Sequence, residues 1–426
     1  MRIAIENGRV IDPANQVDLQ ASLYIAGGRV LALGAKPEGF EADRVIDASG
    51  QIVCPGFVDM STHLREPGQE HKATIVSETK AAVSAGFTTL CCTPSTAPVI
   101  DTPAVANLIQ ERAQLAGNCT VLPIGSLTKG LAGESLSEMG ALQEAGCLAV
   151  SNVDRAIKST LVLRRAMEYA ATYDLLVIIR PEDQGLSEGG FVHEGAVSAR
   201  LGLPGIPDIA ETTAVAQALE LIRHTGVRAH FGQLSSLKAA RMVARAQHEG
   251  VPVSADVSAH QLFLSELDIS GYNAQCNVRP PLRTESDREG LRAAVAEGVI
   301  GAICSDHQPH EVDAKLDVFQ STEPGIAGLE TVLPLLLKLV DEGILSLNEA
   351  LARMTAGPAS ILGFECGQLN RGSPADVTIF DPKKQWQVGD ASWLSAGRNN
   401  PFIGQTATGQ VTLTLRSGQI VFDRNS

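Results

Sequence analysis

The sequence predicts an α/β protein: a closed (β/α)8 barrel with a small flanking β-domain built from both chain ends. Over roughly 300 central residues, apolar runs typical of buried parallel strands alternate with longer helical patterns. Short segments of alternating polarity, broken by turn residues, occur only towards the two ends. The length of 426 residues exceeds what one compact core holds, which favours a barrel plus a smaller domain.

The first part of the β-domain is expected over residues 1–54. Strands are predicted at Arg2–Glu6, Leu23–Ile25 and Arg29–Leu33, with turns at Asn7-Gly8 and Gly27-Gly28. This arrangement predicts a small antiparallel sheet.

The barrel is expected over residues 55–361. Its apolar runs include Thr88–Cys92, Thr120–Ile124, Leu175–Ile179 and Ile300–Ser305, and its helical patterns include Ala104–Ala116, Thr213–His224 and Leu237–His248. Short strands return in residues 362–426, at Asp376–Asp381 and Val411–Phe422. We therefore expect residues 1–54 and 362–426 to form one composite β-domain.

Composition narrows the function classes. The formal net charge is −14 and no Lys/Arg block forms a phosphate-binding face, which disfavours a nucleic-acid partner. The eight cysteines include no CxxC pair, as expected of buried thiols in a reducing compartment. No run of about 18 apolar residues occurs, and the N-terminus alternates like a strand. A soluble, cytoplasmic protein without a membrane partner is predicted.

Two segments place polar groups where barrel proteins keep their sites. In Gly56–Gly68, an apolar run ends with Ser61, His63 and Arg65 at alternate positions, on one face of a strand tip. The second segment, Cys304–His310, places Asp306 at the end of another apolar run. Single matches of this kind arise by chance, so their order along the chain matters.

These segments resemble the dihydroorotase family, whose first strand ends in His-x-His-x-x-Arg-x-Pro-Gly and whose last barrel strand carries a metal-binding, general-base aspartate. Three further segments occur in family order: Pro280–Arg283, Gly325–Thr331 and Gly372–Asp376. Together the matches run from about residue 3 to residue 422. The resemblance implies a metal-dependent hydrolase fold.

The resemblance also implies which positions would hold metal, and most carry other residues here. Only His63 and Asp306 of six ligand positions match the family, and Asp306 is then a vestigial catalytic group. The bridging carboxylate position in Ala149–Asp154 holds Val153 or, one residue earlier, Asn152. The other degenerate positions are Ser61, Arg180 and Gln233.

These replacements disfavour a metal centre. Valine has no lone pair, serine and glutamine are poor ligands, and the charge of Arg180 opposes a cation. Two ligands do not make even a three-ligand zinc site, so no metal cofactor is expected. Arg180 is instead predicted to pair with Asp306, and His63 to be hydrogen-bonded within the barrel mouth.

Substrate-binding positions are also altered. Arg65 and His310 match the family pattern, whereas Ser95 and Arg279 stand where the family has asparagines. A pocket with Arg65, Arg180 and Arg279 could still attract an anion by charge. A site rearranged around the other histidines lacks a His-x-His or i, i+4 pair, and Lys158 is interpreted as a solvated lysine rather than a ligand.

The closest resemblance is to the inactive dihydroorotase-like chains that accompany aspartate carbamoyltransferase in some bacteria. It implies a non-catalytic subunit in pyrimidine biosynthesis, in which six such chains, as dimers, join six catalytic chains in a dodecamer. One alternative is an active dihydroorotase or other cyclic amidohydrolase with an atypical metal site. Another is an anion-sensing regulatory module that uses the arginine-rich pocket.

Overall fold

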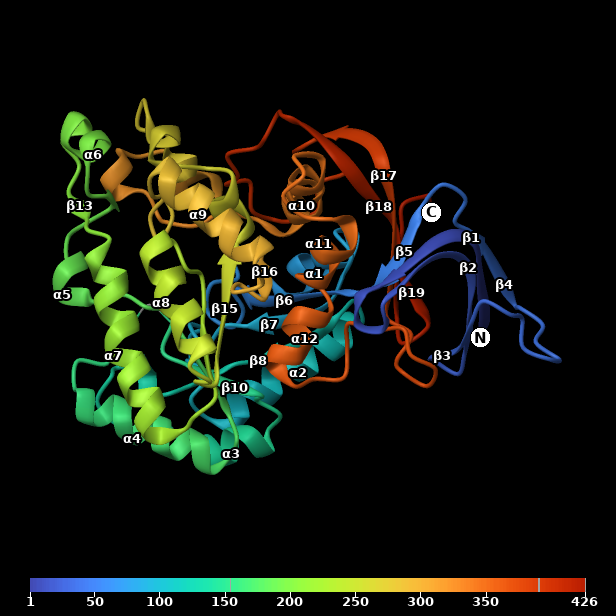
Figure 1. The fold of residues 1–426 in the computed structure, drawn as a ribbon, viewed down its shortest axis with the longest axis horizontal. Helices are drawn as coiled ribbons and strands as arrows, with labels where there is room; N and C mark the ends of the chain where they lie inside the picture. Colours follow the sequence, from blue (N-terminus) through green and yellow to red (C-terminus); the bar gives the residue numbers. More distant parts are fainter. Residues whose placement is uncertain (154, 390, 426) are drawn as a thin grey trace.

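The computed structural model describes residues 1–153, 155–389 and 391–425. Figure 1 shows the helices of a barrel on one side and a large sheet on the other, with both chain ends beside the sheet. The sheet and the barrel are joined directly, because β5 (Ile52–Pro55) of the sheet is followed after one residue by β6 (Phe57–Thr62) of the barrel.

The barrel has eight staves within the described residues, and all pairings between them are parallel. After β6 they are β7 (Phe87–Cys92), β8 (Thr120–Pro123) continued by β9 (Gly125–Ser126), β10 (Ala149–Ser151), β11 (Leu176–Ile179), β14 (Ala229–Phe231), β15 (Val253–Ser258) and β16 (Ala302–Cys304). A parallel bridge from Thr62 to His307 closes the ring between β6 and the segment after β16. The expected (β/α)8 barrel is thus present.

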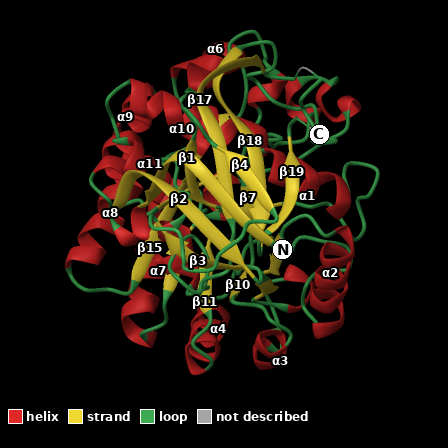
Figure 2. Cartoon of the chain, turned by 90° about the vertical axis from the view of Figure 1, so that its right-hand side faces the viewer, coloured by secondary structure: helices red, strands yellow, loops and turns green. Residues whose placement is uncertain are grey.

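Helices follow the staves, and in the view from the side of the flanking sheet they lie around the strands (Figure 2). They are α1 (Ile75–Ser84), α2 (Pro103–Ala116), α3 (Met139–Glu144), α4 (Thr160–Thr172), α7 (Ile209–Thr225), α8 (Leu237–His248), α9 (Glu285–Ala296) and α10 (Val332–Asp341). Some of these helices begin with a side-chain cap: Ser236 Oγ accepts from Ala239 N at the start of α8, and Thr284 and Asp287 form a capping box at α9.

Shorter elements occupy the connections. They are α5 (Gln184–Ser187), β12 (Val192–His193), α6 (Ala196–Leu201), β13 (Gly205–Ile206), α11 (Leu347–Ala352) and α12 (Ala356–Leu362). Single 3-10 turns lie at Pro13–Asn15, Lys129–Leu131, Ala259–Leu262, Glu266–Ile269, Ala274–Cys276, Val312–Lys315, Phe319–Ser321 and Leu329–Thr331. No helix of the described chain is long and apolar enough to span a bilayer.

The flanking sheet draws its strands from both chain ends. Its order is β19 (Gln419–Asp423), β18 (Thr406–Arg416), β17 (Val377–Gln387), β5, β1 (Arg2–Asp12), β2 (Val17–Ala26) and β3 (Arg29–Leu33), with β4 (Arg44–Asp47) also paired to β1. The two ends meet where β17 pairs antiparallel with β5.

Three local expectations about this sheet were wrong. The sheet is mixed rather than antiparallel, since β4 and β5 run parallel to β1. Asn7-Gly8 makes a bulge inside β1, with Asn7 at φ +62°, because β2 continues to pair on either side of it. The run Val411–Phe422 is a hairpin that turns at Ser417-Gly418, where both residues have positive φ.

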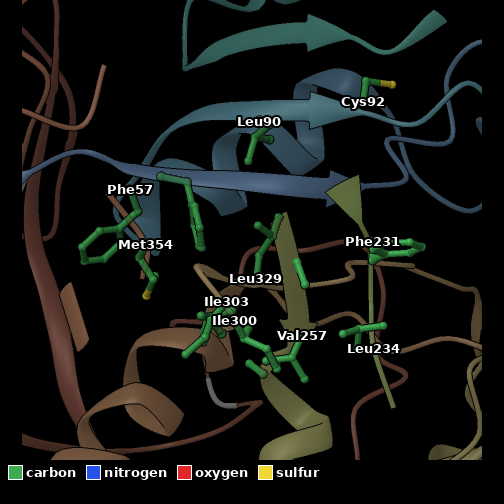
Figure 3. Close-up of a cluster of buried hydrophobic side chains, with 14 of the residues drawn as sticks. Phe57, Leu90, Cys92, Phe231, Leu234, Val257, Ile300, Ile303, Leu329 and Met354 are labelled. Atoms are coloured by element: carbon green, nitrogen blue, oxygen red, sulfur yellow. The ribbon is translucent and has the colours of Figure 1, made fainter. Parts of the chain in front are cut away.

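The main core lies between the staves and the helices. Figure 3 shows part of it, with Phe57, Leu90, Phe231, Val257 and Met354 among the labelled side chains. A separate core fills the flanking sheet with side chains from both chain ends, including Ile3, Val53 and Val377. All eight cysteines are buried and unpaired, as their scatter along the sequence predicted. The barrel core positions the carboxyl ends of the staves, where the candidate site lies.

Candidate functional site

The carboxyl end of the barrel gathers most of the positions that the sequence singled out. Ser61 is in β6 and His63 follows it, while Val153, Arg180, Gln233 and Asp306 come just after β10, β11, β14 and β16. Because parallel strands in a barrel end at the same face, these six residues share one rim.

The two family-like residues, His63 and Asp306, lie on adjacent segments. The backbone N–H of His63 donates to the carbonyl of His307, 2.8 Å away. Nδ1 of His63 lies 3.1 Å from Ser95 Oγ, so this histidine is hydrogen-bonded within the barrel mouth as expected. Burial and the nearby positive charges of Arg65 and Arg180 hold the pKa of His63 well below its usual value.

Asp306 is fully enclosed and bound by neutral groups. Gln308 Nε2 donates to its Oδ1 at 3.1 Å, and Ser61 Oγ lies 3.5 Å from the same atom. Burial raises the pKa of Asp306, while the positive charge of Arg180 acts in the opposite direction.

Arg180 and Asp306 do not form the predicted ion pair, which is a correction to the sequence interpretation. Among the described residues, no contact of 4.0 Å or less joins the two side chains, and Nε and Nη2 of Arg180 are buried without a hydrogen-bond partner. The oxygen Oδ1 of Asp306 is occupied by Gln308 and Ser61 instead. The guanidinium therefore brings a positive charge to the rim without a close ion pair to Asp306.

The bridging position is occupied by Val153, and Asn152 serves another purpose. Asn152 Oδ1 accepts from Thr128 N at 3.2 Å and from Thr128 Oγ1 at 2.8 Å, and its Nδ2 donates to the carbonyl of Arg155. The Asn152 amide thus links the loop after β10 to the loop after β9, which contains Thr128. Asp154, the last residue of the segment quoted above, lies outside the described residues.

The backbone at these stave ends adopts a conformation that ordinary side chains rarely take. Val153, Gln233 and Asp306 all have positive φ, at +50°, +52° and +46°. Positive φ is especially unfavourable for a β-branched residue such as valine. The fold therefore imposes at the rim a backbone conformation that these side chains do not favour.

The four residues at substrate-binding positions are bonded to other side chains. Arg65 Nη2 lies 3.0 Å from His310 Nε2, and its Nε and Nη1 donate to Pro309 O and Gln69 Oε1. Burial, with the charges of Arg65 and Lys72, lowers the pKa of His310 to about 2. Ser95 faces His63 as described above.

Arg279 is held by Glu182. Its Nε donates to both carboxylate oxygens of Glu182 at 3.0 Å, and its Nη2 lies 3.2 Å from Ser187 Oγ. Arg65 and Arg279 are thus each engaged by protein groups. Of the three arginines predicted to share a pocket, Arg180 and Arg279 line one cavity, and Arg65 is not in its lining.

Two buried carboxylates beneath the rim were not identified from the sequence as site residues. Asp59 accepts from the backbone N–H groups of Ser61 and Ser305, and burial raises its pKa to about 7. Asp256 accepts from Gln233 N at 2.7 Å and pairs with His230 at 2.9 Å. Both hold stave ends in place. The feature of the sequence that could have identified them is an acidic residue inside an apolar strand run.

The donor set at the rim does not fit a metal centre. Within the described chain, no group of three or more His, Cys, Asp or Glu side chains converges as metal ligands do. Gln233 Nε2 has only a weak contact, 3.9 Å to Cys304 Sγ, and Val153 supplies no donor atom. A catalytic zinc site needs three protein ligands.

A cavity of about 650 Å³ opens beside the ends of β10 and β11. Its lining includes Asn152, Val153, Arg180 and Arg279. Part of the rim therefore faces a space large enough for a small molecule.

Comparisons with known proteins identify relatives over the full length. Residues 50–239 match a family model described as dihydro-orotase-like. A dihydroorotase-like protein of Pseudomonas aeruginosa is 49% identical over 99% of this chain and 100% of its own length, and one of Pseudomonas putida is 50% identical over 99% of both. A dihydroorotase of Geobacter sp. strain M21 is 43% identical over 99% of both chains.

Solved structures share the architecture. An L-hydantoinase (dihydropyrimidinase) from Arthrobacter aurescens superimposes with a TM-score of 0.88 at 24% identity, covering 99% of this chain and 96% of the other. A dihydropyrimidinase from Brevibacillus agri gives 0.82 at 22% identity, covering 100% and 96%. At this identity the likeness shows the fold alone: an amidohydrolase-type barrel with a β-domain.

Proposed function

The chain belongs to the dihydroorotase-like family, and from this premise we propose that it is a catalytically inactive member. The observation that carries the proposal is the rim itself. Arg180 has unpartnered donors there, Val153 has no ligand atom, and no described cluster could hold a metal. Hydrolysis of a cyclic amide in this family depends on a metal that activates water and polarises the carbonyl, and these side chains do not replace either role.

We further propose that the protein is a structural subunit of aspartate carbamoyltransferase in pyrimidine biosynthesis. Six copies, paired as dimers, would join six catalytic chains. The support is the resemblance described above together with the intact fold. The chain has the complete barrel and composite sheet of similar structures, while the rim, within the described residues, lacks a set of metal ligands, which is expected when the surface rather than the chemistry is used.

A second candidate is an active dihydroorotase or related cyclic amidohydrolase with an atypical site. It is favoured by the identity of 43% to a protein named dihydroorotase. It predicts stoichiometric metal on the purified chain and hydrolysis of dihydroorotate that a chelator abolishes.

The experiment that separates these candidates has two parts. Metal content and dihydroorotate hydrolysis are measured on the purified chain, alone and with added zinc; we expect neither bound metal nor turnover. The chain is then mixed with the aspartate carbamoyltransferase catalytic chain of the same organism and weighed by analytical ultracentrifugation. A complex containing both chains in equal numbers is expected, and two separate species would contradict the subunit proposal.

A further inference from the structure

Arg180 presents an unused hydrogen-bonding edge. Its Nε and Nη2 are buried and have no partner among the described residues. These two nitrogens lie on the same edge of the planar guanidinium and point their hydrogens in parallel, which matches the spacing of two oxygens of a carboxylate or phosphate. A buried donor without an acceptor is destabilising, so this edge calls for an anion.

Three described acids, two close to Arg180 in the sequence and one at the rim, do not supply that anion. Glu182 is engaged by Arg279, with two hydrogen bonds of 3.0 Å. Asp183 Oδ1 accepts from Leu186 N and caps α5. Asp306 forms no ion pair with Arg180, as described above. Among the described residues, the Nε and Nη2 donors of Arg180 therefore have no hydrogen-bond acceptor, although the charge of Arg180 acts at longer range on Asp306 and Glu182.

The cavity beside β10 and β11 has both charged and apolar lining. Three carboxylates line it, those of Glu182, Asp183 and Glu188, and Glu182 is paired with Arg279. Arg180 also lines the cavity, and the exposed side chains of Arg155 and Lys158 add positive charge at its rim. Leu163 of α4 and Ala218 of α7 contribute apolar wall. Its volume of about 650 Å³ suits a small metabolite.

We propose that this cavity binds a small oxyanion, a carboxylate or a phosphate group, on the Nε–Nη2 edge of Arg180. Both nitrogens are shielded from solvent while other atoms of Arg180 line the cavity, so the proposed binding requires the guanidinium to turn this edge towards the cavity. The rest of the ligand lies against α4 and α7. The site uses residues of this chain alone and does not depend on the proposed partner.

The test is isothermal titration calorimetry on the full chain with two probes, succinate and inorganic phosphate, at constant ionic strength set with sodium chloride. We expect saturable binding of one molecule per chain for at least one probe. Stronger binding of succinate assigns a carboxylate ligand, and stronger binding of phosphate assigns a phosphate ligand. No saturable heat from either probe overturns the proposal.

Variants locate the binding. Arg180→Gln removes the fork and should weaken binding about tenfold or more, while Arg180→Lys keeps the charge without the fork and should also weaken it. Arg228→Gln is the matched control, because Arg228 precedes β14 at the opposite end of the barrel. Equal affinity in wild type and Arg180→Gln overturns the proposal.

A cavity-filling variant tests the same proposal independently, in case the Arg180 variants do not fold. Ala214 of α7 lines the same cavity. Ala214→Phe leaves every charge in place and reduces the space, so it should abolish binding while the thermal midpoint of the free chain stays near that of wild type. Undiminished binding in Ala214→Phe places the anion elsewhere and contradicts the proposal.

Discussion

Replacing Glu78 by glutamine should lower the free energy of unfolding more than a Glu→Gln change at the surface does. Glu78 lies in the first turn of α1 and is fully buried, as is its partner His307. Its carboxylate accepts from Ser77 Oγ at 2.7 Å, Ser395 Oγ at 2.6 Å and Ala396 N at 3.1 Å, and pairs with His307 Nε2 at 2.7 Å. The side chain thus ties α1 to the last stave and to the segment that enters the flanking sheet.

The size of the effect follows from these contacts. The glutamine amide keeps one oxygen that accepts hydrogen bonds and has an NH2 group, which donates, in place of the other oxygen. In two of the four interactions a donor would therefore face another donor. Each lost hydrogen bond to a charged group is worth about 1.5 kcal/mol or more, and breaking a buried charged pair typically costs about 3–5 kcal/mol. We expect Glu78→Gln to lower the free energy of unfolding by about 3 kcal/mol.

The assay is a urea titration followed by tryptophan fluorescence. The chain has two tryptophans, and Trp393 is buried beside the Glu78 contacts, with its Nε1 donating to Gly397 O. At a slope of about 3 kcal/mol per molar, the midpoint should fall by about 1 M urea. Glu220→Gln is the control, because Glu220 is exposed and pairs only at the surface with Arg223. If both variants unfold at the same midpoint, the reasoning about Glu78 is wrong.

Three further predictions address the site and its supports. A quadruple variant restores four ligand positions together: Ser61→His, Val153→Asp, Arg180→His and Gln233→His. It should retain zinc after dialysis, measured by mass spectrometry of the metal, whereas wild type should not. A folded variant without metal would show that these positions are not the missing ligands. Burial, with the charge of Arg180, lowers the pKa of His260 to about 3. Between pH 6.5 and 3 this histidine is therefore protonated in the unfolded chain and neutral in the folded chain, so the free energy of unfolding decreases as the pH falls. Between pH 7 and pH 5, His260→Gln should therefore lose about 2 kcal/mol less stability than wild type in urea titrations, and parallel losses would refute this. Gly328→Ala should lower stability by about 1–3 kcal/mol because its new Cβ would lie 2.5 Å from Ser305 O, while Gly232→Ala, with its nearest neighbour at 3.6 Å, should melt close to wild type in calorimetry.

The candidate site could be predicted in part because it follows strand ends. The segments at Ser61–His63 and Cys304–Asp306 have an apolar run followed by polar residues, and such a pattern predicts a stave end wherever the rest of the chain lies. The partners of those residues could not be predicted in the same way. Whether Arg180 contacts Asp306 depends on the distance across the rim between the ends of β11 and β16, which are not neighbours in the barrel. Gln308, two residues after Asp306, donates to the aspartate oxygen instead.

Side chains that come from distant segments show the same limit. Asp59 and Ser305 are far apart in the sequence, and nothing local indicates that the N–H of one would bind the carboxylate of the other. The closure of the barrel between Thr62 and His307 is also a tertiary event. Burial of Asp59 among these groups raises its pKa to about 7, a property that its sequence context alone does not carry.

The sequence by itself determined the alternation of strands and helices, the residues present at the stave ends and the family to which the chain belongs. These are properties of hydrophobic period and residue chemistry, which act over a few neighbouring positions. The tertiary structure alone decided that Asn7-Gly8 is a bulge, that Val411–Phe422 is a hairpin, and that Arg180 keeps an unpaired edge. Each of these depends on which strand or side chain lies alongside, and that is set by packing between segments far apart in the chain.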